Sequence, residues 1–101
     1  MKRYWVAQAT DLVEGRPVHV MAGEDPICLV STGGNVFALS DRCSHEDTPL
    51  SEGQLYEEWI ECPMHGSLFD LRTGAVTGMP AVLPVPVFPV TVEEGKVFID
   101  V

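Results

Sequence analysis

Four residues of this sequence have the types and spacing of metal ligands. Cys43 is followed two positions later by His45, and Cys62 is followed three positions later by His65, which gives the pattern C-x-H-x16-C-x2-H. Thiolates and imidazoles are soft or borderline donors, and two of each suit either one tetrahedral zinc ion or an iron–sulfur cluster. The pattern therefore predicts a metal centre built from two loops, each of which supplies one Cys and one His.

The pairing within each loop bears on which centre this is. Zinc modules commonly pair like ligands, as in C-x2-C or H-x3-5-H, whereas each loop here carries one thiol and one imidazole. A binuclear iron–sulfur centre gives the mixed pairing a reason, because each loop can send its Cys to one iron and its His to the other. A structural zinc site stays the alternative.

At these residues the sequence resembles the Rieske family, and the flanking β segments match the base domain of that family in length and order. The resemblance is carried by Cys43-Ser44-His45, Cys62-Pro63-Met64-His65-Gly66-Ser67, Phe69-Asp70, Thr73-Gly74 and Gly78-Met79-Pro80-Ala81, the last of which is similar to the proline loop that covers the cluster in the family. It implies one [2Fe-2S] cluster per chain, with Cys43 and Cys62 on one iron and His45 and His65 on the other.

Within the family, the sequence resembles one branch in particular. Rieske proteins of quinol oxidoreductases carry a membrane anchor and a disulfide between the cluster loops, whereas Thr48 and Met64 stand at the disulfide positions here and we expect no anchor. The chain is instead similar to the small soluble ferredoxins of multicomponent aromatic-ring dioxygenases. This resemblance implies a one-electron carrier between an NAD(P)H-dependent flavin reductase, the ferredoxin reductase, and a terminal Rieske non-haem iron oxygenase.

Other functions stay open beside this one. A small Rieske subunit of an NADH-dependent nitrite reductase resembles the same family, and a zinc-binding interaction module fits the ligand types. A detached domain of a Rieske oxygenase would normally continue into an iron-binding catalytic domain. The chain itself is not expected to be an enzyme, because it shows no nucleophile with a partnered base, no phosphate-binding glycine loop and no open metal position. Ser67 resembles the residue that donates a hydrogen bond to the cluster in the higher-potential branch, although Phe69 replaces the Tyr that usually accompanies it.

The elements that position these loops are predicted to be strands. Short runs rich in Val, Ile and Phe, separated by Gly, Pro, Asn or Asp, indicate an all-β fold. We expect strands at 4–8, 17–21, 27–31 and 36–39, a turn at 32–35, and a closing hairpin around Glu93-Glu94-Gly95. With the Rieske resemblance, this implies a single domain over residues 1–101: an antiparallel β-sandwich base formed by 1–40 and 87–101, and a small cluster-binding β subdomain inserted at about 41–86.

Charge and cysteine usage restrict the partners. Fifteen acidic and six basic residues give a net charge of −9, which repels nucleic acids and anionic lipids. No apolar run approaches the roughly 18 residues of a membrane span, and an odd number of cysteines argues against a disulfide framework. We therefore expect a cytoplasmic monomer. Eight acids between Asp41 and Asp70 predict an acidic face on the insert, either merely solvated or also steering a basic partner.

The remaining candidates are interpreted as structural. Cys28 lies inside an apolar run and is expected to be a small buried thiol. His19 alternates with Val18 and Val20, so it should point out of a strand, and it is assigned no role. The tryptophans, Trp5 and Trp59, are expected to pack rather than to relay electrons. An apolar tip beside the metal centre is predicted from Pro49, Leu50, Met64, Met79 and Pro80.

Overall fold

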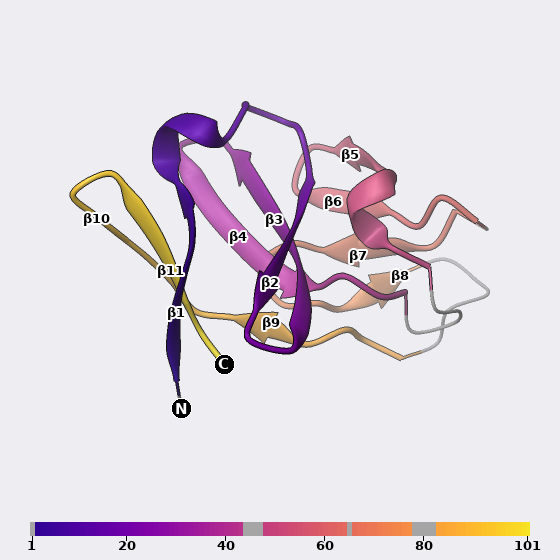
Figure 1. The fold of residues 1–101 in the computed structure, drawn as a ribbon. Helices are drawn as coiled ribbons and strands as arrows, with labels where there is room; N and C mark the ends of the chain where they lie inside the picture. Colours follow the sequence, from indigo (N-terminus) through magenta and orange to yellow (C-terminus); the bar gives the residue numbers. More distant parts are fainter. Residues whose placement is uncertain (1, 44–47, 65, 78–82) are drawn as a thin grey trace.

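The computed structural model describes residues 2–43, 48–64, 66–77 and 83–101. Within these ranges every regular element is a β-strand or a short 3-10 turn, and the strands form three antiparallel sheets (Figure 1). None of the described helical turns has the length or hydrophobicity of a membrane-spanning helix. The predicted all-β fold is confirmed.

Two sheets form the base of the molecule. The first has the order β1-β11-β10 and joins the two chain ends, with strands Arg3–Gln8, Lys96–Asp100 and Val90–Glu93. The second has the order β2-β3-β4-β9, with strands Val18–Ala22, Asp25–Thr32, Asn35–Ser40 and Val87–Phe88. The strands predicted from alternation are therefore present, with ends that differ by one or two residues.

Side chains from both sheets form one core. Ile27 and Leu29 alternate along β3, and Val97 and Ile99 alternate along β11, so each pair faces inward with no exposed surface. This period of two is what packs one face of each strand against the opposite sheet. The hairpin turns that set the register are also as predicted: Gly33 and Gly34 have φ of 61° and 82°, as a two-residue turn between β3 and β4 requires.

The third sheet lies beside the base and was not predicted strand by strand. Its order is β5-β6-β7-β8, with the short strands Gln54–Tyr56, Trp59–Glu61, Leu68–Asp70 and Val76–Thr77. The 3-10 turn η2, Leu50–Glu52, precedes it. In Figure 1 the loops between β6 and β7 and after β4 reach the same end of the molecule, opposite the β10–β11 hairpin.

Arg72 ties the third sheet to the base. Its guanidinium donates from Nε to Glu58 Oε1 at 2.8 Å and from Nη2 to Glu58 Oε2 at 3.0 Å, which closes the β5–β6 turn onto the end of β7. The same guanidinium lies 5.2 Å from the ring centroid of Phe37 on β4. Hydrogen bonds to Arg72 lower the pKa of the Glu58 carboxyl. The ion pair and the stacking on Phe37 together link the β5–β6 turn, the end of β7 and β4.

Candidate metal centre

The two predicted cysteine ligands lie in the segments that come after strands β4 and β6. Cys43 lies three residues beyond β4, and its amide donates to the carbonyl of Thr48 at 2.9 Å. Cys62 follows β6, its amide donates to the carbonyl of Ser67 at 2.8 Å, and its own carbonyl accepts the Gly66 amide at 3.1 Å. Each cysteine amide is therefore tied by a hydrogen bond to the carbonyl five positions later, which restrains its backbone.

Both thiols are buried in the same hydrophobic core. Cys43 is 5% exposed and Cys62 is 2% exposed, and neither is in a disulfide. The core they share consists of Cys28, Val30, Leu39, Leu50, Ile60, Phe69, Leu71 and Val85. Two buried cysteines of one hydrophobic core that form no disulfide fit a soft metal centre such as an iron–sulfur cluster.

The predicted histidine ligands, His45 and His65, lie outside the described residues, as do Met79 and Pro80 of the predicted tip and most of the predicted covering loop. Their assignment stays a prediction. Other predictions are tested directly. Cys28 is buried without exposed surface, and burial, together with the charge of Asp41, raises the pKa of its thiol well above the usual range, as expected for a structural thiol.

A family model described as a Rieske [2Fe-2S] domain matches residues 2–89. The chain belongs to this family. The resemblance stated from the two ligand boxes is thereby confirmed, and with it the [2Fe-2S] cofactor, while a structural zinc site is no longer supported. The assignment of Cys43 and Cys62 as cluster ligands stays a prediction.

Relatives of this Rieske protein are ferredoxins over their full length. It is 38% identical to the 3-phenylpropionate/cinnamic acid dioxygenase ferredoxin subunit of Escherichia coli strain K12, over 99% of this chain and 94% of that one. The ferredoxin of carbazole 1,9a-dioxygenase from Nocardioides aromaticivorans IC177 has a TM-score of 0.92 at 36% identity, and 98% of this chain and 97% of that chain are covered. A ferredoxin in a complex of reduced oxygenase and oxidized ferredoxin of carbazole 1,9a-dioxygenase has a TM-score of 0.89 at 36% identity, covering 96% of this chain and 91% of that one.

One solved structure bears on the alternative function. A chain titled as the small subunit of a putative nitrite reductase aligns over its full length with a TM-score of 0.83, but at 18% identity. At that level the likeness shows the Rieske fold alone. The similarity to dioxygenase ferredoxins, at twice the identity, is therefore the more informative comparison.

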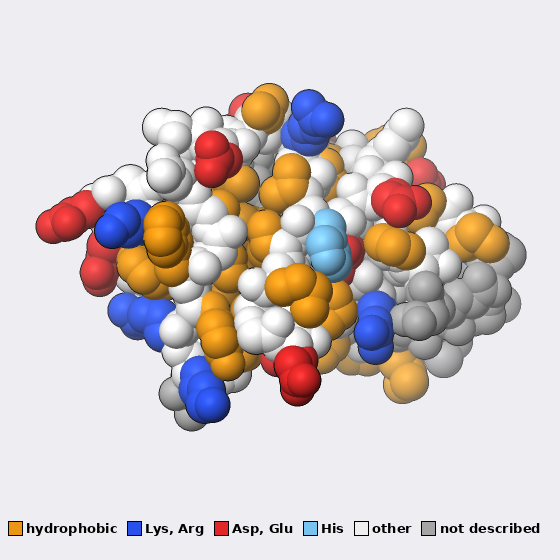
Figure 2. Space-filling model, in the orientation of Figure 1, with side chains coloured by type: hydrophobic (Ala, Val, Ile, Leu, Met, Phe, Trp, Pro, Cys, Tyr) orange, Lys and Arg blue, Asp and Glu red, His pale blue; other side chains and the backbone are white. Residues whose placement is uncertain are grey.

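The predicted acidic face needs two corrections. Asp41 is not solvated, because it is 2% exposed and its carboxylate accepts three hydrogen bonds. Glu58 is paired with Arg72, which lies just beyond the segment that was counted. In Figure 2 the acidic side chains of the described residues are scattered over the visible face.

The predicted apolar tip is correct in one residue and wrong in another. Met64, in the Cys62 loop, is 54% exposed, whereas Leu50, in η2, is completely buried in the core that contains the two cysteines. Sequence reasoning missed Leu83, which is 62% exposed where the described chain resumes before β9. Leu83 is therefore an exposed apolar side chain that the structure adds to the predicted Met64.

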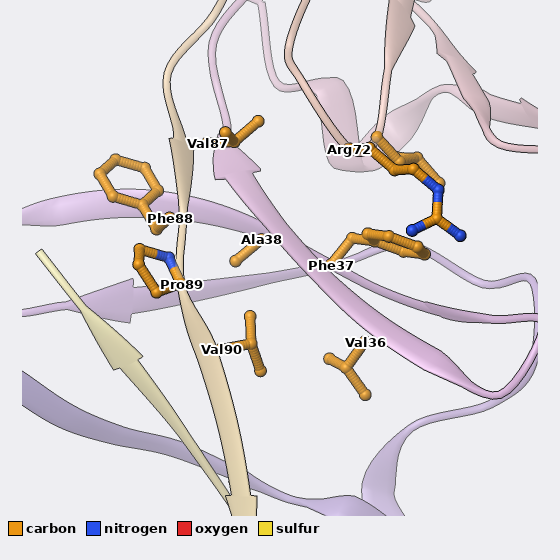
Figure 3. A pocket seen from close by; sticks show the side chains of 9 residues that line it. Val36, Phe37, Ala38, Arg72, Val87, Phe88, Pro89 and Val90 are labelled. Atoms are coloured by element: carbon orange, nitrogen blue, oxygen red, sulfur yellow. The ribbon is translucent and has the colours of Figure 1, made fainter.

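A hollow of about 350 Å³ lies between the base and the end of β7, and neither cysteine lines it. It is formed where β4 meets β9 and β10, and Figure 3 shows Arg72 above it and Phe88 and Pro89 along one side. Its walls are otherwise Val36, Phe37, Ala38, Leu71, Val87 and Val90. Because neither Cys43 nor Cys62 lines this hollow, it is not part of the metal centre.

Sequence reasoning assigned His19 no role, and the structure gives it a partner. The prediction that it points out of its strand is correct, since its side chain is 52% exposed, but Nδ1 lies 2.7 Å from Asp41 Oδ2. The one available signal for the His19 contact was that Asp41 follows a buried strand directly.

Trp5 is 57% exposed, lies 5.3 Å from the Lys96 ammonium, and packs on the outer surface rather than in the core.

Proposed function

We propose that this chain is the electron-carrying ferredoxin component of an aromatic-ring-hydroxylating dioxygenase system. The observation that carries the proposal is full-length similarity, 38% over 101 residues, to a dioxygenase ferredoxin subunit. Cys43 and Cys62, which are buried and form no disulfide, are consistent with it. The chain is not itself an enzyme in this proposal. In this proposal the protein works in the cytoplasm, where its partners supply and accept the electrons.

Cys43 and Cys62 would hold one iron of the cluster, and His45 and His65 would hold the other. Bound there, the [2Fe-2S] cluster supplies a site for a single electron. The protein contributes an environment for it: the closed turns at both cysteines fix the ligand positions, and the apolar core formed by Leu50, Ile60 and Phe69 excludes water behind them. Exclusion of water and fixed ligands keep the structural change on electron transfer small.

The partners follow from the same proposal. A flavin-dependent ferredoxin reductase would deliver one electron at a time, and a terminal Rieske non-haem iron oxygenase would accept it. The solved complex of a reduced oxygenase with an oxidized ferredoxin, whose ferredoxin resembles this chain at a TM-score of 0.89, supports the oxygenase as partner. The exposed Met64 and Leu83 are available to an apolar contact of the small, transient kind that redox partners form.

Spectroscopy and matched variants test this function. The purified, dithionite-reduced protein should contain iron and sulfide and give the EPR signal of a mixed-ligand [2Fe-2S] centre. Cys43→Ser and Cys62→Ser should abolish that signal, while Cys28→Ser, a substitution in the same core, should retain it. A colourless, zinc-containing protein, or loss of the signal in Cys28→Ser alone, would contradict the assignment.

The histidine assignment has its own test. His45→Cys and His65→Cys, where a cluster assembles, should lower its midpoint potential, because a thiolate adds negative charge to the reducible iron. An unchanged potential in both variants would refute the ligand set. Reduction by a dioxygenase ferredoxin reductase and re-oxidation by the terminal oxygenase then distinguish the dioxygenase role from that of a nitrite reductase subunit, for which a stable complex with the large subunit is expected.

A further inference from the structure

Asp41 is the buried carboxylate of this structure that the electron-carrier function leaves unexplained. It follows β4 directly and precedes Cys43 by two residues, and its side chain is 1% exposed. Burying a carboxylate is costly unless donors replace water around it. The burial of the Asp41 carboxylate at the start of a ligand loop therefore needs a physical explanation.

The donors around Asp41 come from both parts of the fold. Ser51, in η2, donates its amide to Oδ1 at 2.6 Å and its hydroxyl to Oδ2 at 2.8 Å. His19, on β2 of the base, places Nδ1 at 2.7 Å from the same Oδ2. The Asp41 amide donates to the carbonyl of Pro26 on β3 at 3.0 Å. Asp41 thus joins the base to η2, the turn that carries Leu50 of the cysteine-containing core.

The charge of Asp41 also reaches the core that holds the cysteines. Cys28 belongs to the same core cluster as Cys43 and Cys62, and the Asp41 charge is, after burial, the second cause of its raised thiol pKa. In a buried region of low dielectric, such a fixed charge is felt more strongly than the same charge at the surface. An added electron at a neighbouring site would be opposed by it.

We propose that Asp41 is a positioning residue of the electron-transfer site, which braces the Cys43 segment against η2 and holds a buried negative charge that lowers the midpoint potential. The inference rests on the proposed electron-carrier function. Uptake of one electron transfers no atom and adds one negative charge, so the repulsion acts on the reduced state. Neutralising Asp41 should therefore favour reduction.

Four isosteric or near-isosteric variants separate charge from structure. Asp41→Asn removes the buried charge, Asp25→Asn removes an exposed charge from β3, and Ser51→Ala removes a donor but keeps the carboxylate. His19→Gln keeps a donor and removes any positive charge. We expect the equilibrium constant for reduction to rise about three- to tenfold in Asp41→Asn alone, as for unit charges about 6–12 Å apart at an effective dielectric of about 40, between the values for protein and water. Tenfold corresponds to about 59 mV for one electron.

The result is measured by spectroelectrochemical titration of the loaded protein, together with hydrogen exchange of residues 50–53. Exchange should quicken in Asp41→Asn, because a neutral amide oxygen accepts the Ser51 amide less strongly than a carboxylate does. An unchanged or lowered potential in Asp41→Asn, or an equal rise in Ser51→Ala, would overturn the charge role, and unchanged exchange would overturn the brace. Absence of a cluster from the native protein would instead refute the proposed function, with the exchange measurement still deciding on the brace.

Discussion

Gly53 offers a sharp test of how the metal-centre loops are held. It lies between η2 and β5 with φ of −85°, a conformation open to any residue, so its backbone angles do not require glycine. Space does: a Cβ atom there would overlap the carbonyl oxygen of Glu61 and stand 3.2 Å from that of Leu50. Glu61 immediately precedes Cys62, so Gly53→Ala should push the Cys62 turn away from η2.

Two opposing terms set the magnitude for Gly53→Ala. Alanine restricts the unfolded chain and, where it fits, stabilises by about 0.4–1 kcal/mol. Overpacking costs about 1–3 kcal/mol, and a backbone obstacle belongs at the upper end because it cannot rotate away. We expect a net loss of about 2 kcal/mol, which lowers the urea midpoint by about 1 M for a protein of this size.

The matched control for this experiment is Gly34→Ala. Gly34 has φ of 82° and open space where its Cβ would be, so this substitution costs only the left-handed conformation, about 1 kcal/mol. It lies in the β3–β4 turn and should leave the visible and EPR spectra unchanged. Gly53→Ala should alter them. A Gly53→Ala protein as stable as the native one, with an unchanged spectrum, would refute the close approach of η2 and β6.

Three further substitutions follow from the site and the Arg72 contact. Ser67→Ala should lower the midpoint potential by about 40–90 mV, since Ser67 is buried in the Cys62 turn and a hydrogen bond to the cluster would strengthen on reduction; titration of the potential checks this. Cys28→Ser should keep the EPR signal but lower the thermal midpoint, because a more polar group replaces a fully buried thiol. Glu58→Gln should destabilise the folded protein at neutral pH and much less near pH 3. Because the pKa of Glu58 is lowered in the folded state, its pair with Arg72 stabilises the fold above the ordinary value of 4.5, and this stabilisation is lost progressively as the pH falls below it. Urea unfolding at both pH values checks this.

Much of the base was predictable because its signals are local. Continuous apolar runs of four residues define β3 and β4, alternating apolar residues define β10 and β11, and paired positive-φ residues lie in their turns. The ligand boxes were equally readable, since the chemistry of two thiols and two imidazoles restricts the spacing. These features need no knowledge of which distant segments meet.

The third sheet and the Asp41 contacts were not predictable for the opposite reason. Strands β5 to β8 have two or three residues each, too few for alternation to show. Leu50 looked like a tip residue because its neighbours in sequence are polar, and only η2 turns it inward. Asp41 looked like any surface acid, because its partners His19 and Ser51 are 22 and 10 residues away.

The corrected charge distribution leads to a prediction about partner association. With Asp41 buried and Glu58 paired, two other acids of the insert remain candidates. The Glu61 carboxylate lies beside Gly66 of the Cys62 loop, and Glu52 precedes Gly53, which closely approaches the Glu61 carbonyl. If these charges steer the protein toward a basic patch, its reduction by the ferredoxin reductase should slow as salt rises. The Debye length falls from about 10 Å at 0.1 M to about 3 Å at 1 M.

Paired variants locate the steering charge. Glu52→Gln with Glu61→Gln should flatten the salt dependence of the stopped-flow reduction rate, because it removes two charges near the loops. Glu93→Gln with Glu94→Gln removes the same number from the β10–β11 turn, at the opposite end of the molecule (Figure 1), and should leave the slope as in the native protein. Steering depends on where the charge lies, whereas net charge alone would make the two pairs equal. Equal slopes, or a native rate that does not respond to salt, would mean that the acidic residues of the insert are merely solvated and do not steer association.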